Sequence, residues 1–269
     1  ASFIKQFENA DTYGSLITVQ ADDEIDSAID SFEGKIGFDR SHLEHFMQLY
    51  KILSQRYDVV CTNPPYMGSG NMNSKLKDYI EANFPDYKSD LYSAFIEKCG
   101  TLANNNGFYS MITQQSWMYI ASYEKLRANL KSKSIISMAH LGARAFDEIS
   151  GEVVQTTSFI ISKKYIKGYI GKYIRLVDGT NEIAKKEMFL SGTNVFLSNS
   201  EKYALIPGEP IAYWLSDKFL SCFCNKKIAD YGETREGITT ANNDLFLKMW
   251  FEVNIQNICF TCKSQSESE

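Results

Sequence analysis

Residues 57–66 read Tyr-Asp-Val-Val-Cys-Thr-Asn-Pro-Pro-Tyr, and this run decides the fold that we predict. Its first six residues are largely apolar and β-branched, which is typical of a short strand buried on both faces of a parallel sheet. The strand must stop at the next four residues, because two adjacent prolines remove two backbone donors and fix φ. In open α/β sheets, ligands bind beyond the carboxyl ends of strands. The run therefore predicts a ligand site at the end of a buried strand.

The loop residues suit a flat base that carries an exocyclic amine. The side-chain oxygen of Asn63 and the carbonyl of Pro64 are two acceptors for the two protons of an NH2 group. Holding both protons localises the nitrogen lone pair and aligns it for a methyl group, which is catalysis by positioning and electrostatics. The Tyr66 ring offers a face for a base swung out of a duplex, and such stacking contributes about 1–3 kcal/mol. No general base is needed, because the amine can lose its proton after the transfer.

The tetrapeptide Asn63-Pro64-Pro65-Tyr66 resembles the catalytic loop of amino-methyltransferases that use S-adenosylmethionine (SAM), above all the DNA adenine-N6 enzymes. This resemblance implies that all four residues are catalytic and that Pro65 also lines the SAM adenine pocket. Protein-glutamine and some RNA methyltransferases carry the same tetrapeptide. The alternative without function is a Pro-Pro turn after a strand.

The pattern around the loop predicts the rest of the sheet. Residues 107–113 read as the next parallel strand, and residues 135–140 and 153–162 as two more. The connection 141–151 is too short for a crossover helix, so we expect the last two strands to be antiparallel. We predict helices over 41–56, 89–98 (capped by Ser89), 122–130, 180–190 and 210–222. This order matches the α/β, Rossmann-like sheet of SAM-dependent methyltransferases, mostly parallel with an antiparallel edge.

Three further residues receive roles by resemblance alone. Phe95 matches the aromatic that packs against the adenine of SAM, with core packing as the alternative. Asp11, within Phe7–Ile17, matches the acidic residue that accepts from the SAM adenine amine, with a turn or capping Asp as the alternative. Phe146 matches a second aromatic that sandwiches the flipped base with Tyr66, and a hydrophobic plug at a strand end competes with that interpretation.

The glycine-rich loop that cradles the methionine part of SAM in this family has no counterpart in the sequence. Residues 1–56 contain no Phe-x-Gly-x-Gly pattern, and Gly68, Gly70, Gly168 and Gly171 stand at the wrong places. We therefore expect an internal fragment, truncated at its N-terminus, that binds SAM weakly and is inactive alone. We predict a methyltransferase core over 1–166, a connector over 167–226 and the start of a target-recognition domain over 227–269.

Composition restricts the partners. The net charge of −5 and the pI near 5.4 argue against a nonspecific nucleic-acid coat, although a local basic face is compatible with DNA binding. Neither a signal peptide nor a membrane span is predicted, and we expect reduced thiols in the cytoplasm. A zinc site at Cys222, Cys224, Cys259 and Cys262 is conceivable, but we expect no metal. The residues considered for a basic face are Lys131, Lys133, Lys163, Lys164, Lys167, Lys172 and Arg175, with a solvated surface as the alternative.

The second half of the chain sharpens the resemblance. Residues 235–246 are similar to the segment that opens the target-recognition domain of large adenine methyltransferases, except that Ala241 stands where Gly is usual. The chain to about residue 253 looks most like the PglX-like methyltransferases of BREX phage-defence systems and their type II restriction-modification relatives. We predict transfer of a methyl group from SAM to adenine N6 in double-stranded DNA, with other subunits of a defence complex as further partners. The alternatives are an RNA or protein-glutamine methyltransferase and a non-catalytic DNA-binding subunit.

Overall fold

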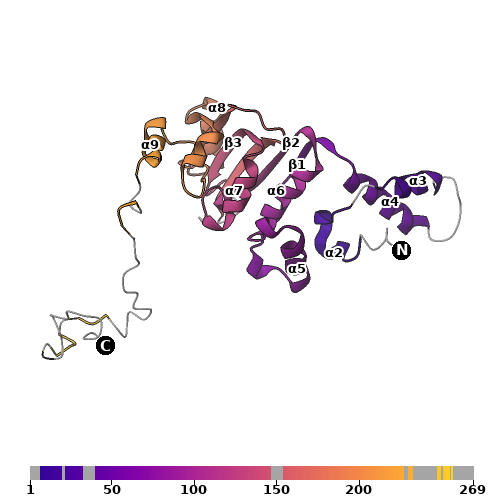
Figure 1. Ribbon diagram of the computed structural model, residues 1–269, viewed down its shortest axis with the longest axis horizontal. Helices are drawn as coiled ribbons and strands as arrows, with labels where there is room; N and C mark the ends of the chain where they lie inside the picture. The colour runs from indigo at the N-terminus through magenta and orange to yellow at the C-terminus, as the bar shows by residue number, and fades with distance from the viewer. Residues whose placement is uncertain are drawn as a thin grey trace. The chain divides into compact units, whose positions relative to one another are not determined.

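The computed structural model describes residues 7–19, 22–32, 40–146 and 154–226, and a few positions beyond them (Figure 1). Residues 1–224 form one compact unit and residues 225–269 a second. The recognition-like segment 235–246, Asp147, Cys259 and Cys262 lie outside the described residues.

A six-stranded mixed sheet organises the first unit, in the order β1-β2-β4-β3-β5-β6. The pairs β1·β2 and β3·β5 are parallel, whereas β2·β4, β3·β4 and β5·β6 are antiparallel. The predicted α/β class, the parallel pairing of residues 107–113 and the antiparallel third and fourth strands are confirmed. The strands are β1 (Tyr57–Thr62), β2 (Ala103–Gln114), β3 (Ser134–Gly142), β4 (Thr156–Ser162), β5 (Ile170–Arg175) and β6 (Val195–Asn199).

Two details of the predicted sheet differ from the structure. The antiparallel strand β4 lies inside the sheet, because β5 and β6 extend it beyond β3; residues 167–226, predicted as a connector, thus supply two of its strands. Strand β1 is at the edge of the described sheet, and Val59 is 63% exposed instead of buried on both faces. Its apolar sequence is that of a central strand, but within the described residues β2 alone pairs with it.

Side chains alternate between the two faces of the sheet, as the twofold period of a strand requires. One face is covered by α6 (Leu91–Leu102) and α7 (Glu124–Leu130), and carries the main core, including Tyr109, Met111 and Phe159 (Figure 1). The opposite face keeps large apolar side chains exposed; examples are Phe108 and Ile160, at 38% and 39%. The core is thus one-sided in the described chain, and the helices on that side reach the carboxyl ends of β1 and β2.

Among the remaining helices, α4 (Arg40–Ser54) and α8 (Glu182–Ser191) match the helices predicted over 41–56 and 180–190, with shifted ends. The other helices are α2 (Ala10–Tyr13), α3 (Asp23–Phe32) and α5 (Ser74–Asn83), which were not predicted, and α9 (Asp217–Ser221). The helix predicted over 210–222 is wrong for residues 210–216, because the Ile211 amide donates to the Met118 carbonyl at 2.8 Å instead of joining a helix. Ser216 then caps the short α9.

The cap of α6 also differs from the prediction. Asp90, and not Ser89, is the N-cap residue, and its side chain accepts from the Tyr92 amide. Among the described helices, none combines the length and apolar character needed to cross a lipid bilayer. The described residues also hold no group of three or more His, Cys, Asp or Glu side chains arranged for a metal ion.

Candidate active site

The Asn63–Tyr66 loop follows directly on the carboxyl end of β1, where the sequence places it. The Asn63 side chain is exposed and Pro64 is buried, so the amide faces solvent from a fixed backbone. The Tyr66 hydroxyl donates to the Ile112 carbonyl at 3.2 Å and lies 3.4 Å from Asn63 Oδ1. Burial raises the pKa of Tyr66, and the nearby Asp90 carboxylate raises it further, so the phenol stays protonated as a donor.

Asp90 holds the backbone that follows this loop. One carboxylate oxygen accepts the Met67 amide and the Tyr92 amide, both at 3.1 Å. The Leu91 amide in turn donates to the Met67 carbonyl at 2.9 Å, which completes a short clamp between the loop and α6. Asp90 is 6% exposed, and its burial raises its pKa against the opposing effect of three backbone donors. The Asn63–Tyr66 loop is therefore held by its own two prolines and by Asp90, which binds the backbone after it.

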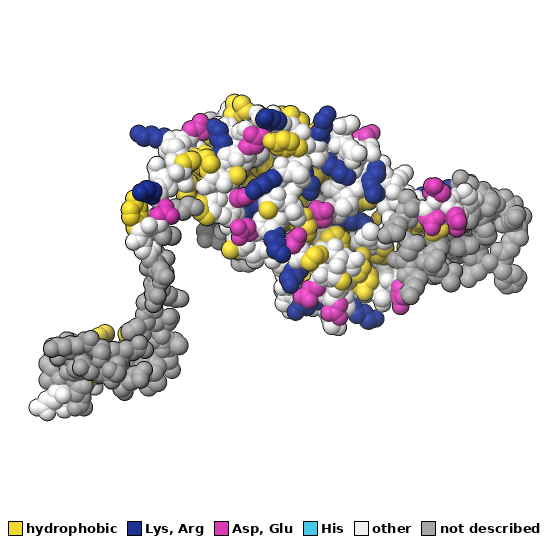
Figure 2. All heavy atoms as spheres, in the orientation of Figure 1, with side chains coloured by type: hydrophobic (Ala, Val, Ile, Leu, Met, Phe, Trp, Pro, Cys, Tyr) yellow, Lys and Arg dark blue, Asp and Glu magenta, His cyan; other side chains and the backbone are white. Residues whose placement is uncertain are grey.

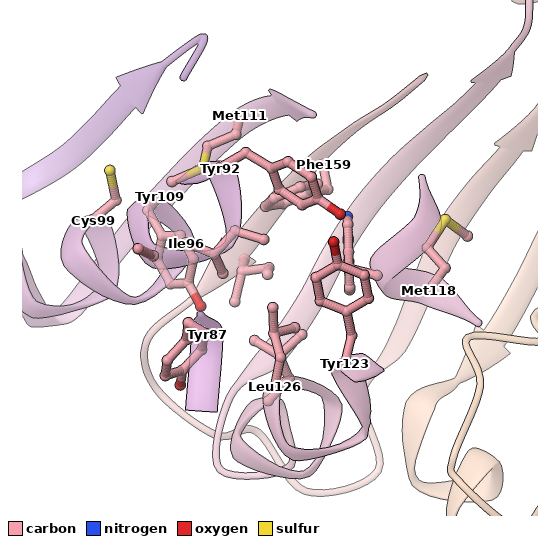
Figure 3. Packing of buried hydrophobic residues seen from close by; sticks show 14 of the residues in the cluster. Tyr87, Tyr92, Ile96, Cys99, Tyr109, Met111, Met118, Tyr123, Leu126 and Phe159 are labelled. Carbon is pink, nitrogen blue, oxygen red and sulfur yellow. The ribbon is translucent and has the colours of Figure 1, made fainter. Parts of the chain in front are cut away.

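A layer of buried aromatic side chains supports the loop from the core. Tyr92 meets the Tyr66 ring edge-on, with centroids 6.0 Å apart, and stacks on Tyr123 at 5.9 Å. The hydroxyl ends of Tyr92 and Tyr123 converge in Figure 3, and that of Tyr92 is 2.7 Å from Ser116 Oγ. Ser116 belongs to the turn after β2, so this contact connects the loop after β1 to the neighbouring strand end.

A second polar cluster lies along the same edge of the sheet, around the buried His140 near the end of β3. His140 Nε2 is 2.6 Å from Gln115 Oε1, and Nδ1 is 2.8 Å from the Tyr213 hydroxyl. Gln115 Nε2 donates to Gln155 Oε1, and the two residues also share a backbone hydrogen bond. Burial lowers the pKa of His140 to about 4, helped by Arg175 and Lys185, so the ring is neutral at pH 7. The sequence-based site did not include this cluster.

The three residues predicted to hold SAM are not assembled into one pocket. Asp11 is exposed on α2, Pro65 is exposed, and Phe95 is half-buried against the main core. A cavity of about 310 Å³ does lie beside α2 and α5, but none of the three lines it. Its lining consists of Glu8, Asn9, Tyr13, Ile17, Thr18, Tyr79 and Asn83. The contacts of Asp11, Pro65 and Phe95 with SAM therefore stay a prediction.

Phe146 is not brought to Tyr66. It is exposed at the end of the described segment after β3, and among the described residues the Tyr66 ring contacts Tyr92 and not Phe146. Strands β2 and β4 separate β1 from β3, which is three strand spacings or about 14 Å. A base sandwiched by both rings requires the connection between β3 and β4 to fold back across that distance.

The basic residues considered for a DNA-binding face are partly engaged within the protein. Lys131 pairs with Glu209, Lys133 lies 3.5 Å from Glu97, and Lys163 donates to the Ala103 carbonyl at 2.7 Å. Figure 2 shows basic and acidic side chains interspersed over the face that carries α6 and α7. That face is therefore a mixed surface and not a basic stripe.

Two parts of the site were missed by reasoning from the sequence. The cap of α6 was assigned to Ser89, and Asp90, an equally suitable capping residue one position later, was not included in the site. Gln115 and His140 are 25 residues apart, and only the antiparallel β4, which places Gln155 between them, brings their strand ends together.

Comparison with known proteins identifies the class of this fold and site. The model of a family described as "Eco57I restriction-modification methylase" matches residues 3–146. This match spans β1, the Asn63–Tyr66 loop, α6 and β2. The chain belongs to the Eco57I restriction-modification methylase family.

Two individual proteins resemble the chain over nearly its whole length. The chain is 40% identical over 267 residues to the adenine-specific methyltransferase PglX of Lacticaseibacillus casei (strain Zhang), covering 92% of this chain and 22% of the relative. It is 40% identical over 274 residues to the adenine-specific methyltransferase BrxX of Escherichia coli O9:H4 (strain HS), covering 97% and 22%. The predicted resemblance to PglX-like and restriction-modification methyltransferases is thus confirmed. The chain spans about a fifth of the length of these relatives.

Among solved structures, the chain matches a nuclease-deletion mutant of the Type ISP restriction-modification enzyme LlaGI in complex with a DNA substrate mimic. The two share 16% sequence identity with a TM-score of 0.43, and the match covers 64% of this chain and 17% of that one.

Proposed function

We propose that this chain carries the target-base side of a DNA adenine-N6 methyltransferase. The observation that carries the proposal is the Asn63–Tyr66 loop, an exposed carboxamide on a clamped backbone at the carboxyl end of β1, in a member of a methylase family. The names of the two relatives, both adenine-specific methyltransferases, support adenine as the base. SAM supplies the methyl group when it is bound.

The described residues act on the base. Asn63 Oδ1 and the Pro64 carbonyl accept the two protons of the adenine amine, so the nitrogen lone pair points away from the ring plane. The Tyr66 ring stacks on the flipped base, and its hydroxyl, held by the Ile112 carbonyl, keeps the ring in place. The amine gains a methyl group and releases one proton to solvent. Phe146 is proposed as the second stacking ring, and Asp11, Pro65 and Phe95 as contacts to the SAM adenine.

The biological role follows from the same relatives. We propose that methylation marks the DNA of the cell in a BREX-type or restriction-modification phage-defence system, in the cytoplasm and with other subunits of a defence complex. The segment from residue 227 onward would open a target-recognition domain that selects the methylated sequence.

The test compares three proteins at their full natural length: the wild type, Asn63→Ala and Tyr66→Ala. Each is incubated with tritiated SAM and mixed-sequence duplex DNA, and the digest is assayed for N6-methyladenine. Asn63→Ala abolishes transfer while SAM binding, measured by calorimetry, is retained. Tyr66→Ala raises the KM for DNA by about tenfold or more, since one stacking contact is lost. Normal methylation by both variants would overturn the site assignment, and methylation of RNA or of a protein glutamine alone would overturn the substrate.

A further inference from the structure

A cavity of about 250 Å³ opens at the edge of the sheet where β2 ends. Its walls are the last residue of β2 and the two residues after it, a neighbouring turn that carries an aromatic ring, and the residue that precedes β4. They are Gln114, Gln115, Ser116, Tyr119, Ile120 and Gln155. Ile112, which accepts the Tyr66 hydroxyl, lies three residues before Gln115, so the two sites are separated by about 10 Å along β2.

The orientation of the Gln115 carboxamide is fixed by the cluster behind it. Gln115 Oε1, an acceptor, lies 2.6 Å from His140 Nε2, and the Tyr119 hydroxyl lies 3.1 Å from the same nitrogen. This arrangement is satisfied when Nε2 carries the ring proton and Nδ1 accepts from the Tyr213 hydroxyl. The carboxamide NH2 of Gln115 consequently points to Gln155 and the cavity. One of its two N–H groups is used by Gln155 Oε1, and within the described residues the second is left for a ligand.

The aromatic wall of the cavity is equally well fixed. The buried Arg127 donates to the carbonyls of Trp117 and Ile120 at 2.9 and 2.8 Å, and to that of Gly208 at 2.8 Å. These bonds hold the turn that carries Tyr119, whose ring meets Trp214 edge-on at 5.9 Å. A rigid carboxamide beside a half-buried aromatic ring and the aliphatic Ile120 is a combination suited to a nucleobase, which has hydrogen-bonding edges and apolar faces.

We infer that this cavity, through the carboxamides of Gln115 and Gln155, reads the base of a nucleotide flanking the target adenine. The inference rests on the proposed function, since the flanking nucleotide is defined by an adenine at Asn63. Gln115 contacts the base directly, and His140 is a positioning residue that selects the direction of the carboxamide. Ser116, bonded to Tyr92 under the Tyr66 ring, keeps the two sites in register.

The experiment uses the protein at its full natural length and duplexes in which each of the four base pairs is placed beside the methylated adenine. For the wild type, the best and worst flanking pairs at one position differ in kcat/KM by about tenfold or more, the size of a carboxamide–base contact. In Gln115→Leu this spread collapses to within about threefold, mainly through KM, because the donors are gone. Gln48→Leu, the same change on an exposed residue of α4, retains the full spread.

The role of His140 is separated from stability by a second pair of variants. His140→Gln keeps a donor toward Gln115 and retains part of the flanking preference. His140→Leu loses the flanking preference, and its kcat on the best duplex changes less than its KM. An unchanged flanking preference in Gln115→Leu, or no preference in the wild type, would overturn this inference alone. A wild type that methylates no duplex would instead overturn the proposed function.

Discussion

Replacing Asp90 tests how the Asn63–Tyr66 loop is held. Asp90→Ala removes the N-cap of α6, which costs about 1 kcal/mol, and leaves the half-buried Met67 amide without its acceptor, which costs about 1–3 kcal/mol. The free energy of unfolding should therefore fall by about 2–4 kcal/mol, reduced somewhat because a buried carboxylate is no longer desolvated. Methyl transfer should fall as well, because Tyr66 and Asn63 precede the released backbone.

The matched variant is Asp90→Asn, which keeps an acceptor oxygen for both amides and removes the charge. It should lie within about 1 kcal/mol of the wild type in urea unfolding and retain most of the methyl-transfer rate. Wild-type stability in Asp90→Ala would refute the clamp. Equal losses in Asp90→Ala and Asp90→Asn would show that the charge matters and the acceptor does not.

Three further predictions follow from the core and the cofactor side. His140 has a pKa of about 4 in the folded protein against an ordinary 6.5, so its contribution to stability is complete above pH 6.5, and about 3 kcal/mol is lost as the pH falls to 4. In urea unfolding, His140→Gln should lack that loss. The same fall of stability with pH in His140→Gln and the wild type would contradict the prediction. Tyr109→Phe deletes a buried hydroxyl that has no partner among the described residues, and it should leave stability unchanged or raise it by about 1 kcal/mol. Tyr87→Phe breaks a 2.7 Å hydrogen bond to Glu97 and should lower stability by about 1 kcal/mol in the same unfolding assay. The present chain, which has no Phe-x-Gly-x-Gly pattern, should bind SAM weakly or not at all. A micromolar affinity measured by calorimetry would contradict this expectation.

The local parts of the fold and site could be predicted from the sequence because they depend on neighbouring residues. Asn63–Tyr66 ends a strand because of its prolines, and residues 141–151 are too short for a crossover, which fixed the antiparallel pairing of β3 and β4. These inferences use only covalent geometry and connection length, so they do not depend on tertiary contacts.

The parts that failed depend on contacts between distant residues. The exposure of Val59 is set by which strand pairs with β1, and the sequence of β1 does not contain that information. The helix expected over 210–222 gave way because the Ile211 amide is taken by Met118, 93 positions away in the chain. The Gln115–His140 cluster likewise exists only after β4 has placed Gln155 between two strand ends.

The most direct test of the central claim is the product formed by the protein at its full natural length. Wild type and Asn63→Ala are incubated with tritiated SAM and duplex DNA, and the nucleosides are separated after digestion. The account predicts labelled N6-methyladenine from the wild type and none from Asn63→Ala, although both bind SAM. Label on another nucleoside, or equal N6-methyladenine from both proteins, would contradict it.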